Sequence, residues 1–185
     1  MLTSVNPSTG KPINTFSEMS NSEIEKIISS ANEAFKTWKS VSFKERSKLM
    51  HNAAEALREN KDIYSRLMTE EMGKPIKQSY AEVEKCAWVC EYYADNAEGF
   101  LNDELIKTDA RKSFVTYQPL GVVLAVMPWN FPFWQVFRFA APGLMAGNAG
   151  ILKHASNVSG CALAIEDVFR KAGFPENIFR TILVP

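Results

Sequence analysis

The sequence predicts an α/β protein in which a helical segment precedes half of a doubly wound parallel sheet, in the order β-α-β-α-β. Three observations support this fold class. Apolar residues recur at helical spacing through most of the first hundred residues. Later, short apolar runs alternate with amphipathic stretches, as they do in βαβ units. The connections between these stretches are short, so the crossovers are expected to be right-handed.

The first elements are marked by turn and capping residues. Turn formers at positions 6–12 separate two short apolar patches, which predicts a small hairpin within residues 1–19. The run Ser20-Asn21-Ser22-Glu23 fits a capping box and opens a helix with one apolar stripe. Ser42-Phe43-Lys44-Glu45 repeats that pattern and predicts a second helix.

Two further helices complete the helical segment. One is expected from about Lys61 to Met72, ending at Gly73, which suits a left-handed cap position. Pro75 can start a longer helix whose apolar positions continue to Ala97. None of these helices carries an obvious chemical motif, so they are interpreted as packing elements.

The pattern changes after the fourth helix. Residues 113–117 alternate in polarity like a half-buried strand, and Gly121 to Met127 form an apolar run typical of a parallel strand covered on both faces. Beyond it we expect a helix over 132–146 interrupted near Pro142-Gly143, a strand over 149–153, a helix over 157–171 and a strand over 178–184.

These elements suggest three parts. They are an amino-terminal helical segment over 1–103, a strand segment over 104–120, and the first βαβαβ half of a nucleotide-binding sheet over 121–185. Half a sheet leaves an uncovered edge, so we expect the chain to be a fragment of a larger protein.

Composition excludes several classes of protein. The 185 residues contain 21 Lys and Arg and 21 Asp and Glu, a balance that offers no electrostatic surface for nucleic acid or anionic membranes. No apolar run is long enough to span a membrane, and the polar amino terminus is not a signal peptide. Three cysteines without metal-ligand spacing predict no metal site and a reducing, cytoplasmic location.

Candidate site residues lie just after the two parallel strands, because ligands bind beyond the carboxyl ends of such strands. Asn130 lies between Pro128 and Pro132, and its amide could stabilise a developing oxyanion. An asparagine that satisfies its own turn is the commoner role, and the residues alone favour it.

The second segment, residues 153–157, has a similar ambiguity. Lys153 could reach a ribose or phosphate, or it could extend to solvent beside an ordinary helix cap provided by Ser156 or Asn157. No Gly-x-Gly-x-x-Gly motif occurs, which excludes the standard dinucleotide fingerprint. Arg138 interrupts an apolar series and needs an anion, for which a substrate and a structural carboxylate are equally good candidates.

The thiols and imidazoles offer little catalytic potential. Cys86 and Cys90 lie one helical turn apart, where a disulfide would be strained, and Cys161 falls within a predicted amphipathic helix. All three are interpreted as core thiols. His51 and His154 have no partner visible in the sequence, so a catalytic triad is not supported.

The chain resembles the aldehyde dehydrogenase superfamily over nearly its whole length. The resemblance rests on Pro128-Trp129-Asn130-Phe131-Pro132, on Gly147-Asn148 with Leu152-Lys153, and on the stretches 6–10 and 73–75. Within that superfamily it is more similar to succinate-semialdehyde dehydrogenases, through residues 130–138 and 152–157.

The resemblance implies roles for particular residues. Asn130 would be the oxyanion-hole amide, and Lys153 would bind the adenosine ribose of the cofactor. Ser156 leaves room for a 2′-phosphate where many NAD-preferring relatives carry a glutamate, so NADP is expected to be preferred and NAD possible. The remaining cofactor-binding residues implied are Met127, Pro128, Trp129, His154 and Ala155, together with Asn130 itself.

The resemblance also implies a reaction. Arg138, with Trp134 nearby, would bind the free carboxylate of succinate semialdehyde, which is oxidised to succinate through a cysteine thiohemiacetal. The nucleophilic cysteine and the general-base glutamate of the family have no counterpart among these residues, so the chain alone is expected to be inactive. The resemblance also implies that residues 1–103 belong to the cofactor-binding domain and residues 104–120 to the oligomerisation region. Family members form dimers or tetramers, and a homo-oligomer is expected.

Two alternatives stay open. The substrate could be another small aldehyde, with Arg138 paired inside the protein. In the second alternative, the chain is a truncated, non-catalytic module that binds a partner chain or a nucleotide.

Overall fold

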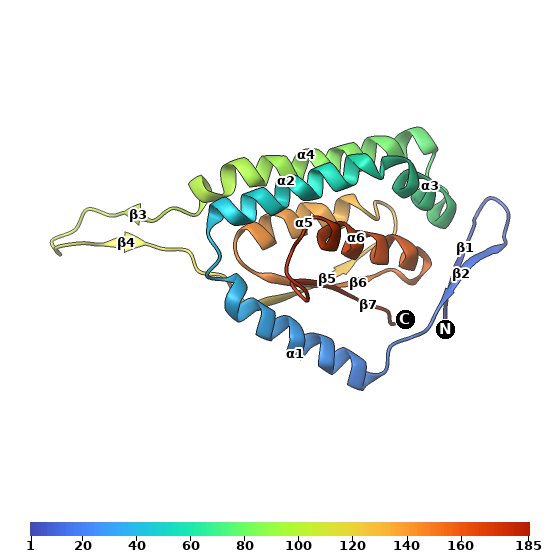
Figure 1. The fold of residues 1–185 in the computed structure, drawn as a ribbon, viewed down its shortest axis with the longest axis horizontal. Helices are drawn as coiled ribbons and strands as arrows, with labels where there is room; N and C mark the ends of the chain where they lie inside the picture. The colour runs from blue at the N-terminus through green and yellow to red at the C-terminus, as the bar shows by residue number, and fades with distance from the viewer.

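The structure is a computed structural model that describes all residues from Met1 to Pro185. Figure 1 shows the chain from its amino-terminal hairpin to its carboxyl-terminal strand. The strands are β1 (Leu2–Val5), β2 (Pro12–Phe16), β3 (Glu104–Leu105), β4 (Phe114–Val115), β5 (Val122–Met127), β6 (Ala149–His154) and β7 (Phe179–Ile182). The helices are α1 (Asn21–Trp38), α2 (Phe43–Glu59), α3 (Lys61–Met72), α4 (Ile76–Phe100), α5 (Trp134–Met145) and α6 (Ser159–Lys171).

The central sheet consists of three parallel strands in the order β5-β6-β7. α5 connects β5 to β6 and α6 connects β6 to β7, so the predicted βαβαβ arrangement is confirmed. The register places Met127 opposite His154, which aligns the carboxyl ends of β5 and β6.

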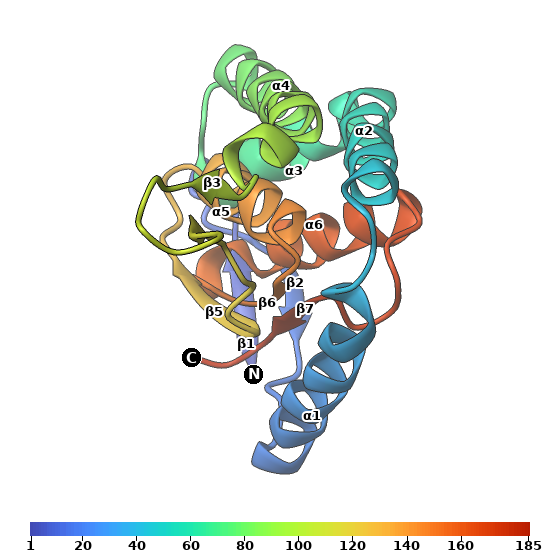
Figure 2. The ribbon, with the colours of Figure 1, turned by 90° about the vertical axis from the view of Figure 1, so that its left-hand side faces the viewer.

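The helices cover the sheet in layers (Figures 1 and 2). α5 and α6 lie against one face, with α2, α3 and α4 forming an outer layer above them, and α1 lies on the opposite side. The main core of 35 buried residues lies between the sheet and α2–α6, with Trp38 from the end of α1, whereas Ile27, Ala31 and Ile151 form a small separate cluster under α1. None of the six helices combines the length and the apolar character needed to cross a membrane.

The expected caps form at the first helices, with one difference. At α1 the Ser20 hydroxyl accepts from the Glu23 N–H, and the Glu23 carboxylate accepts from the Ser20 N–H, so the capping box is complete. At α2 only the first half forms, because the Ser42 hydroxyl accepts from the Glu45 N–H without the reciprocal bond. α3 ends at Gly73 in the left-handed conformation, as predicted.

Three predictions about the later elements were wrong. α5 is continuous through Pro142, and the Ala146 N–H donates to the Pro142 carbonyl at 2.9 Å, so helical hydrogen bonding continues beyond the proline. β4 is only two residues long, and both of its side chains are exposed. One face of β5 is also open, since Leu124 and Val126 are 59% and 67% exposed while Ala125 between them is buried.

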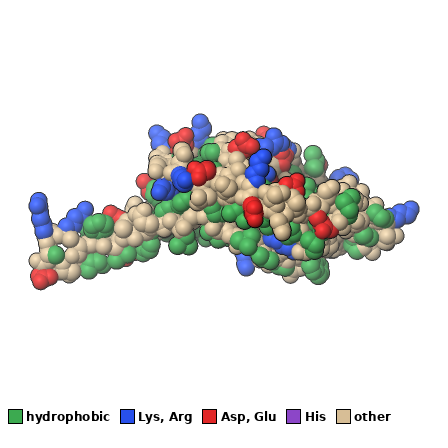
Figure 3. Space-filling model, turned by 90° about the horizontal axis from the view of Figure 1, so that it is seen from below, with side chains coloured by type: hydrophobic (Ala, Val, Ile, Leu, Met, Phe, Trp, Pro, Cys, Tyr) green, Lys and Arg blue, Asp and Glu red, His purple; other side chains and the backbone are tan.

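Residues 101–120 form an arm that projects away from the body (Figures 1 and 3). β3 and β4 pair antiparallel through only two residues each. Large apolar side chains along the arm are exposed, and they are Leu105, Ile106, Phe114, Val115, Tyr117 and Leu120. The arm therefore has no core of its own.

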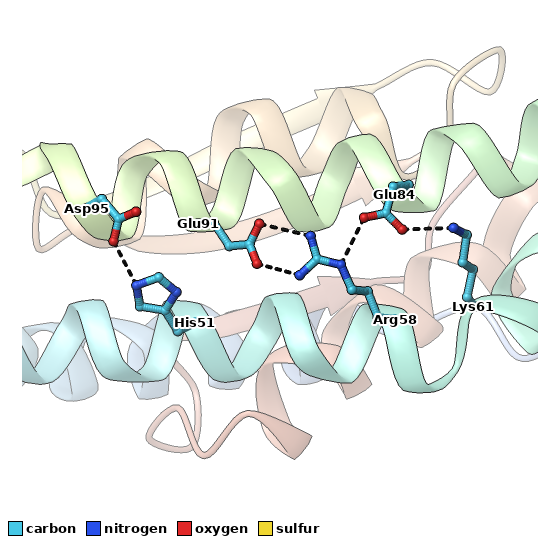
Figure 4. A network of polar contacts seen from close by, with 6 residues as sticks. All are labelled: His51, Arg58, Lys61, Glu84, Glu91 and Asp95. Carbon is cyan, nitrogen blue, oxygen red and sulfur yellow. Dashed lines mark hydrogen bonds and ion pairs between the residues drawn. The ribbon is translucent and has the colours of Figure 1, made fainter.

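A row of ion pairs joins α2 and α3 to α4 on the outer surface (Figure 4). The Arg58 guanidinium contacts both Glu84 and Glu91, and Lys61 donates to Glu84 at 2.8 Å. These contacts lower the pKa of both carboxyl groups. Because the groups are partly exposed, each pair contributes at most about 1 kcal/mol, and the row aligns the helices more than it stabilises them.

Candidate functional site

The two predicted site segments meet at one edge of the sheet. Met127 and His154 are the last paired residues of β5 and β6, and the Ala155 N–H donates to the Met127 carbonyl at 3.0 Å. The chain then leaves both strands side by side, so the segment that begins at Met127 lies next to the one that begins at Lys153. Candidate residues far apart in the sequence therefore share one site.

Asn130 lies in the bend between β5 and α5 and is exposed. Its carboxamide makes no hydrogen bond within the protein, and both of its N–H donors are free for an external oxygen atom. The commoner role, in which the asparagine satisfies its own turn, is therefore not found. Trp129 and Phe131 on either side are also exposed, whereas Pro132 and Phe133 are buried and anchor the far end of the bend.

His154 ties this bend to β6. Its ring is 4% exposed, the Nδ1 atom accepts from the Ala155 N–H at 2.9 Å, and the Nε2 atom lies 2.9 Å from the Pro132 carbonyl oxygen. This pattern assigns the proton to Nε2 in a neutral ring, and burial lowers the pKa of the imidazole. Both ring nitrogens are thus engaged with backbone, so the ring faces the loop rather than an external ligand.

Lys153 and Ser156 are the other candidate residues at the carboxyl end of β6. The Lys153 side chain is half-buried and the Ser156 side chain is exposed, and neither makes an ion pair or a hydrogen bond with another side chain. The predicted helix cap at Ser156 or Asn157 was wrong. A short 3₁₀ turn over Ser156–Val158 precedes α6, and the first N–H groups of α6 are satisfied from another part of the chain.

Arg138 lies on α5 one turn after Trp134, so their side chains leave the same face of the helix. It is exposed and forms no ion pair, which removes the structural carboxylate as its partner. Trp134 is half-buried beneath the Lys85 ammonium, which lies 3.9 Å from the centre of its ring. An open pocket of about 310 Å³ lies beside it, lined by Gln78, Ala81, Glu82, Lys85, Phe131 and Trp134.

Sequence reasoning missed a buried ion pair next to this bend. Lys74 and Glu82 are 5% and 4% exposed, and the Lys74 ammonium donates to Glu82 Oε2. The other oxygen, Oε1, accepts from the N–H groups of Phe133 and Trp134 at 2.9 and 3.0 Å. Glu82 therefore caps α5 from α4, across some fifty residues of sequence. In the sequence, Glu82 is one of several acidic residues of α4, and no signal marks it as buried.

A second buried carboxylate caps α6. Glu71 is 2% exposed, and its two oxygens accept from the N–H groups of Gly160 and Cys161 at 2.9 and 2.8 Å. Helix N-termini are the usual pyrophosphate sites in doubly wound folds. Here those donors are already bonded to protein carboxylates at both α5 and α6. The sequence has no glycine fingerprint, and the starts of α5 and α6 offer no free N–H groups at these positions for a phosphate.

Comparison with known families identifies the chain. The model of the aldehyde dehydrogenase family matches residues 1–184, nearly the whole length. The chain belongs to the aldehyde dehydrogenase family. A probable NADP⁺ succinate-semialdehyde dehydrogenase from Synechocystis is 54% identical over 183 residues, which are 99% of this chain and 40% of that protein. An NADP⁺ succinate-semialdehyde dehydrogenase from Mycobacterium tuberculosis is 46% identical over 186 residues, 99% of this chain and 41% of that protein.

The same relationship is visible in solved structures. The succinic semialdehyde dehydrogenase of Streptococcus pyogenes, crystallised in complex with NADP⁺, superposes with a TM-score of 0.96 at 32% identity. That superposition covers 100% of this chain and 41% of the other. This aldehyde dehydrogenase chain thus spans about two fifths of the length of the relatives it matches.

The cysteines of this aldehyde dehydrogenase chain are core residues, as predicted. Cys86, Cys90 and Cys161 are all fully buried and free. Burial raises the pKa of each thiol, so the thiolate that acts as a nucleophile is disfavoured at all three positions. None of the three thiols is exposed to an external substrate.

Proposed function

We propose that the whole protein oxidises succinate semialdehyde to succinate with NADP. The observation that carries this proposal is a set of unpaired polar groups, two at the carboxyl ends of β5 and β6 and one on α5. Asn130, Lys153 and Arg138 each present a side chain that is not bonded to any other group of the protein. The relatives that match the chain are named for this aldehyde and this cofactor.

Asn130 would act on the reacting carbonyl. Its free N–H donors stabilise the negative charge that develops on the aldehyde oxygen when a nucleophile attacks, and the bend holds them in place beforehand. The resemblance assigns the nucleophilic thiol and the general base to parts of the family that have no counterpart among these residues. We therefore propose that residues 1–185 alone catalyse no oxidation.

The residues at the end of β6 fit NADP. Lys153 offers an unpaired ammonium and Ser156 an exposed neutral hydroxyl, which suits a ribose that carries a 2′-phosphate. When bound, the nicotinamide would accept a hydride. Met127, Pro128, Trp129 and Ala155 would line the same edge, whereas His154 would support it through the backbone. NAD lacks the 2′-phosphate and would bind more weakly.

Arg138 would bind the substrate's free carboxylate. It is exposed, carries no protein counter-ion, and lies one turn beyond Trp134 on the helix that begins at the bend. A planar guanidinium is suited to a two-point contact with a carboxylate. This arrangement favours a semialdehyde with a terminal acid over another small aldehyde.

Arg138→Leu in the whole protein should raise KM for succinate semialdehyde about 10- to 100-fold, the equivalent of a charge-assisted hydrogen bond. KM for an uncharged aldehyde such as butanal should change less than about threefold. Initial rates with both substrates, with NADP and with NAD, measure this. Arg138→Lys should lie between the two, and Arg170→Leu on the far helix α6 is the control. Equal increases for both aldehydes would refute the carboxylate role.

We also propose that a second copy of the protein covers the arm. Its exposed apolar side chains and its two-residue strands have no partner within the chain (Figure 3). Light scattering should give the mass of a dimer or tetramer for the whole protein. Phe114→Asp with Leu105→Asp should shift that mass toward the monomer. A wild-type protein that is monomeric at micromolar concentration would contradict the proposal.

A further inference from the structure

The bend that carries Asn130 is held at consecutive residues by Glu82 of α4, by Lys74 just before α4 and by His154 of β6. Glu82 accepts from the N–H groups of Phe133 and Trp134. The Lys74 ammonium, bonded to the same carboxylate, lies 3.6 Å from the centre of the Phe131 ring. Phe131 directly follows Asn130, and His154 holds Pro132 from the other side. Every residue from 131 to 134 is therefore fixed by a partner outside the bend.

Asn130 has no such partner. Because its carboxamide makes no hydrogen bond within the protein, its direction depends on the backbone next to it. We propose that Lys74 and Glu82 are positioning residues, which hold the backbone after Asn130 so that its N–H donors point to one place. This inference rests on the proposed role of Asn130 in the reaction.

Stability alone is a weak reason for this ion pair. Two buried charges cost several kcal/mol in lost hydration, and well-packed apolar residues often replace such pairs without loss. Glu71 shows that a buried carboxylate can cap a helix here without a lysine. At Glu82 the added lysine extends the contact to the face of Phe131, next to Asn130. The cation therefore connects the cap of α5 to the bend that carries Asn130.

The four tryptophans allow a direct test on the chain itself. Trp129 and Trp134 flank the bend, Trp38 lies in the core at 1% exposure, and Trp88 lies on α4 six residues after Glu82. In ¹⁹F NMR of protein labelled with 5-fluorotryptophan, each residue gives one resonance. Single Trp→Phe variants assign the four resonances.

Glu82→Asp keeps the charge beside Lys74 but withdraws the carboxylate by one methylene from the two N–H groups. We expect the Trp129 and Trp134 resonances to shift or broaden, while those of Trp38 and Trp88 stay in place. Glu71→Asp is the matched control, because it shortens the same kind of buried cap at α6. It should leave Trp129 and Trp134 unchanged.

Two results would overturn the proposal. One is that no resonance moves in Glu82→Asp, and the other is that all four move alike, which indicates general destabilisation. If Glu82→Asp does not fold, Lys74→Met with Glu82→Gln replaces it, since this pair has no charge and keeps an oxygen for the two N–H groups. In that variant Trp129 should still move, because Phe131 has lost its cation.

Kinetics of the whole protein supply an independent measurement. Glu82→Asp should lower kcat about 10-fold or more, because small misplacement of a reacting group is costly, with KM for NADP changed less than about twofold. A fall confined to KM would contradict a positioning role. If the whole protein oxidises no aldehyde, the proposed function fails, while the NMR result still decides whether the pair holds the bend.

Discussion

Asn130→Ala should lower kcat of the whole protein about 10²- to 10³-fold, the loss found when one oxyanion-stabilising donor is removed. The reason is that the carboxamide offers two N–H donors with no competing partner in the protein. KM for NADP should stay within about twofold. Steady-state kinetics at saturating cofactor give both values.

The substitution should not affect folding. The side chain is exposed and makes no hydrogen bond within the protein, so the free energy of unfolding should change by less than about 0.5 kcal/mol. Asn130→Asp keeps the size and removes the donors, and its negative charge opposes an oxyanion, so its kcat should be at least as low. If kcat of Asn130→Ala stays within threefold of wild type, Asn130 is only a turn residue.

The parts of the site that follow from local sequence could be predicted. The predicted strands that end at Met127 and Lys153 are parallel, and parallel strands align their carboxyl ends. That reasoning is enough to place Asn130 and Lys153 on one edge. The cap at Ser20 and the end of α3 at Gly73 could also be predicted from the sequence, because each depends on residues within one helical turn.

What could not be predicted depends on contacts between distant residues. Glu82 and Trp134 are 52 residues apart, and Glu71 and Cys161 are 90 apart. In sequence, both glutamates belong to amphipathic helices with many charged residues, and nothing distinguishes a buried carboxylate from a solvated one. For Arg138 the sequence misleads in the other direction. Its position in an apolar series suggests burial, although the side chain is exposed. The direction of a side chain at the end of a helical face is set by its tertiary neighbours.

The carboxylate caps also explain why the helices of the amino-terminal segment are more than packing. α3 and α4 each supply one buried glutamate to the start of a crossover helix, Glu71 to α6 and Glu82 to α5. The negative charges oppose the positive ends of the helix dipoles. Through these two glutamates, α3 and α4 help to hold the loops after β5 and β6. The proposed ligands bind at these loops.

Gly160→Ala should destabilise the chain by about 2–4 kcal/mol, from overpacking and from the loss of a buried charged hydrogen bond. A Cβ atom at this position would lie 2.7 Å from Glu71 Oε1. The carboxylate is buried and holds the N–H groups of Gly160 and Cys161, so it cannot move aside without breaking both bonds. Urea unfolding followed by circular dichroism measures the change.

Gly99→Ala is the matched control, because Gly99 lies in α4 and a Cβ atom there meets nothing within 4 Å. Replacing a helical glycine by alanine in open space should stabilise the chain by about 0.5–1 kcal/mol, opposite in sign to Gly160→Ala. A third variant isolates the cause. In a Glu71→Ala background the clash is gone, so adding Gly160→Ala should cost nothing further. If it still costs about 2 kcal/mol or more, the glycine is required for a reason other than the Glu71 cap.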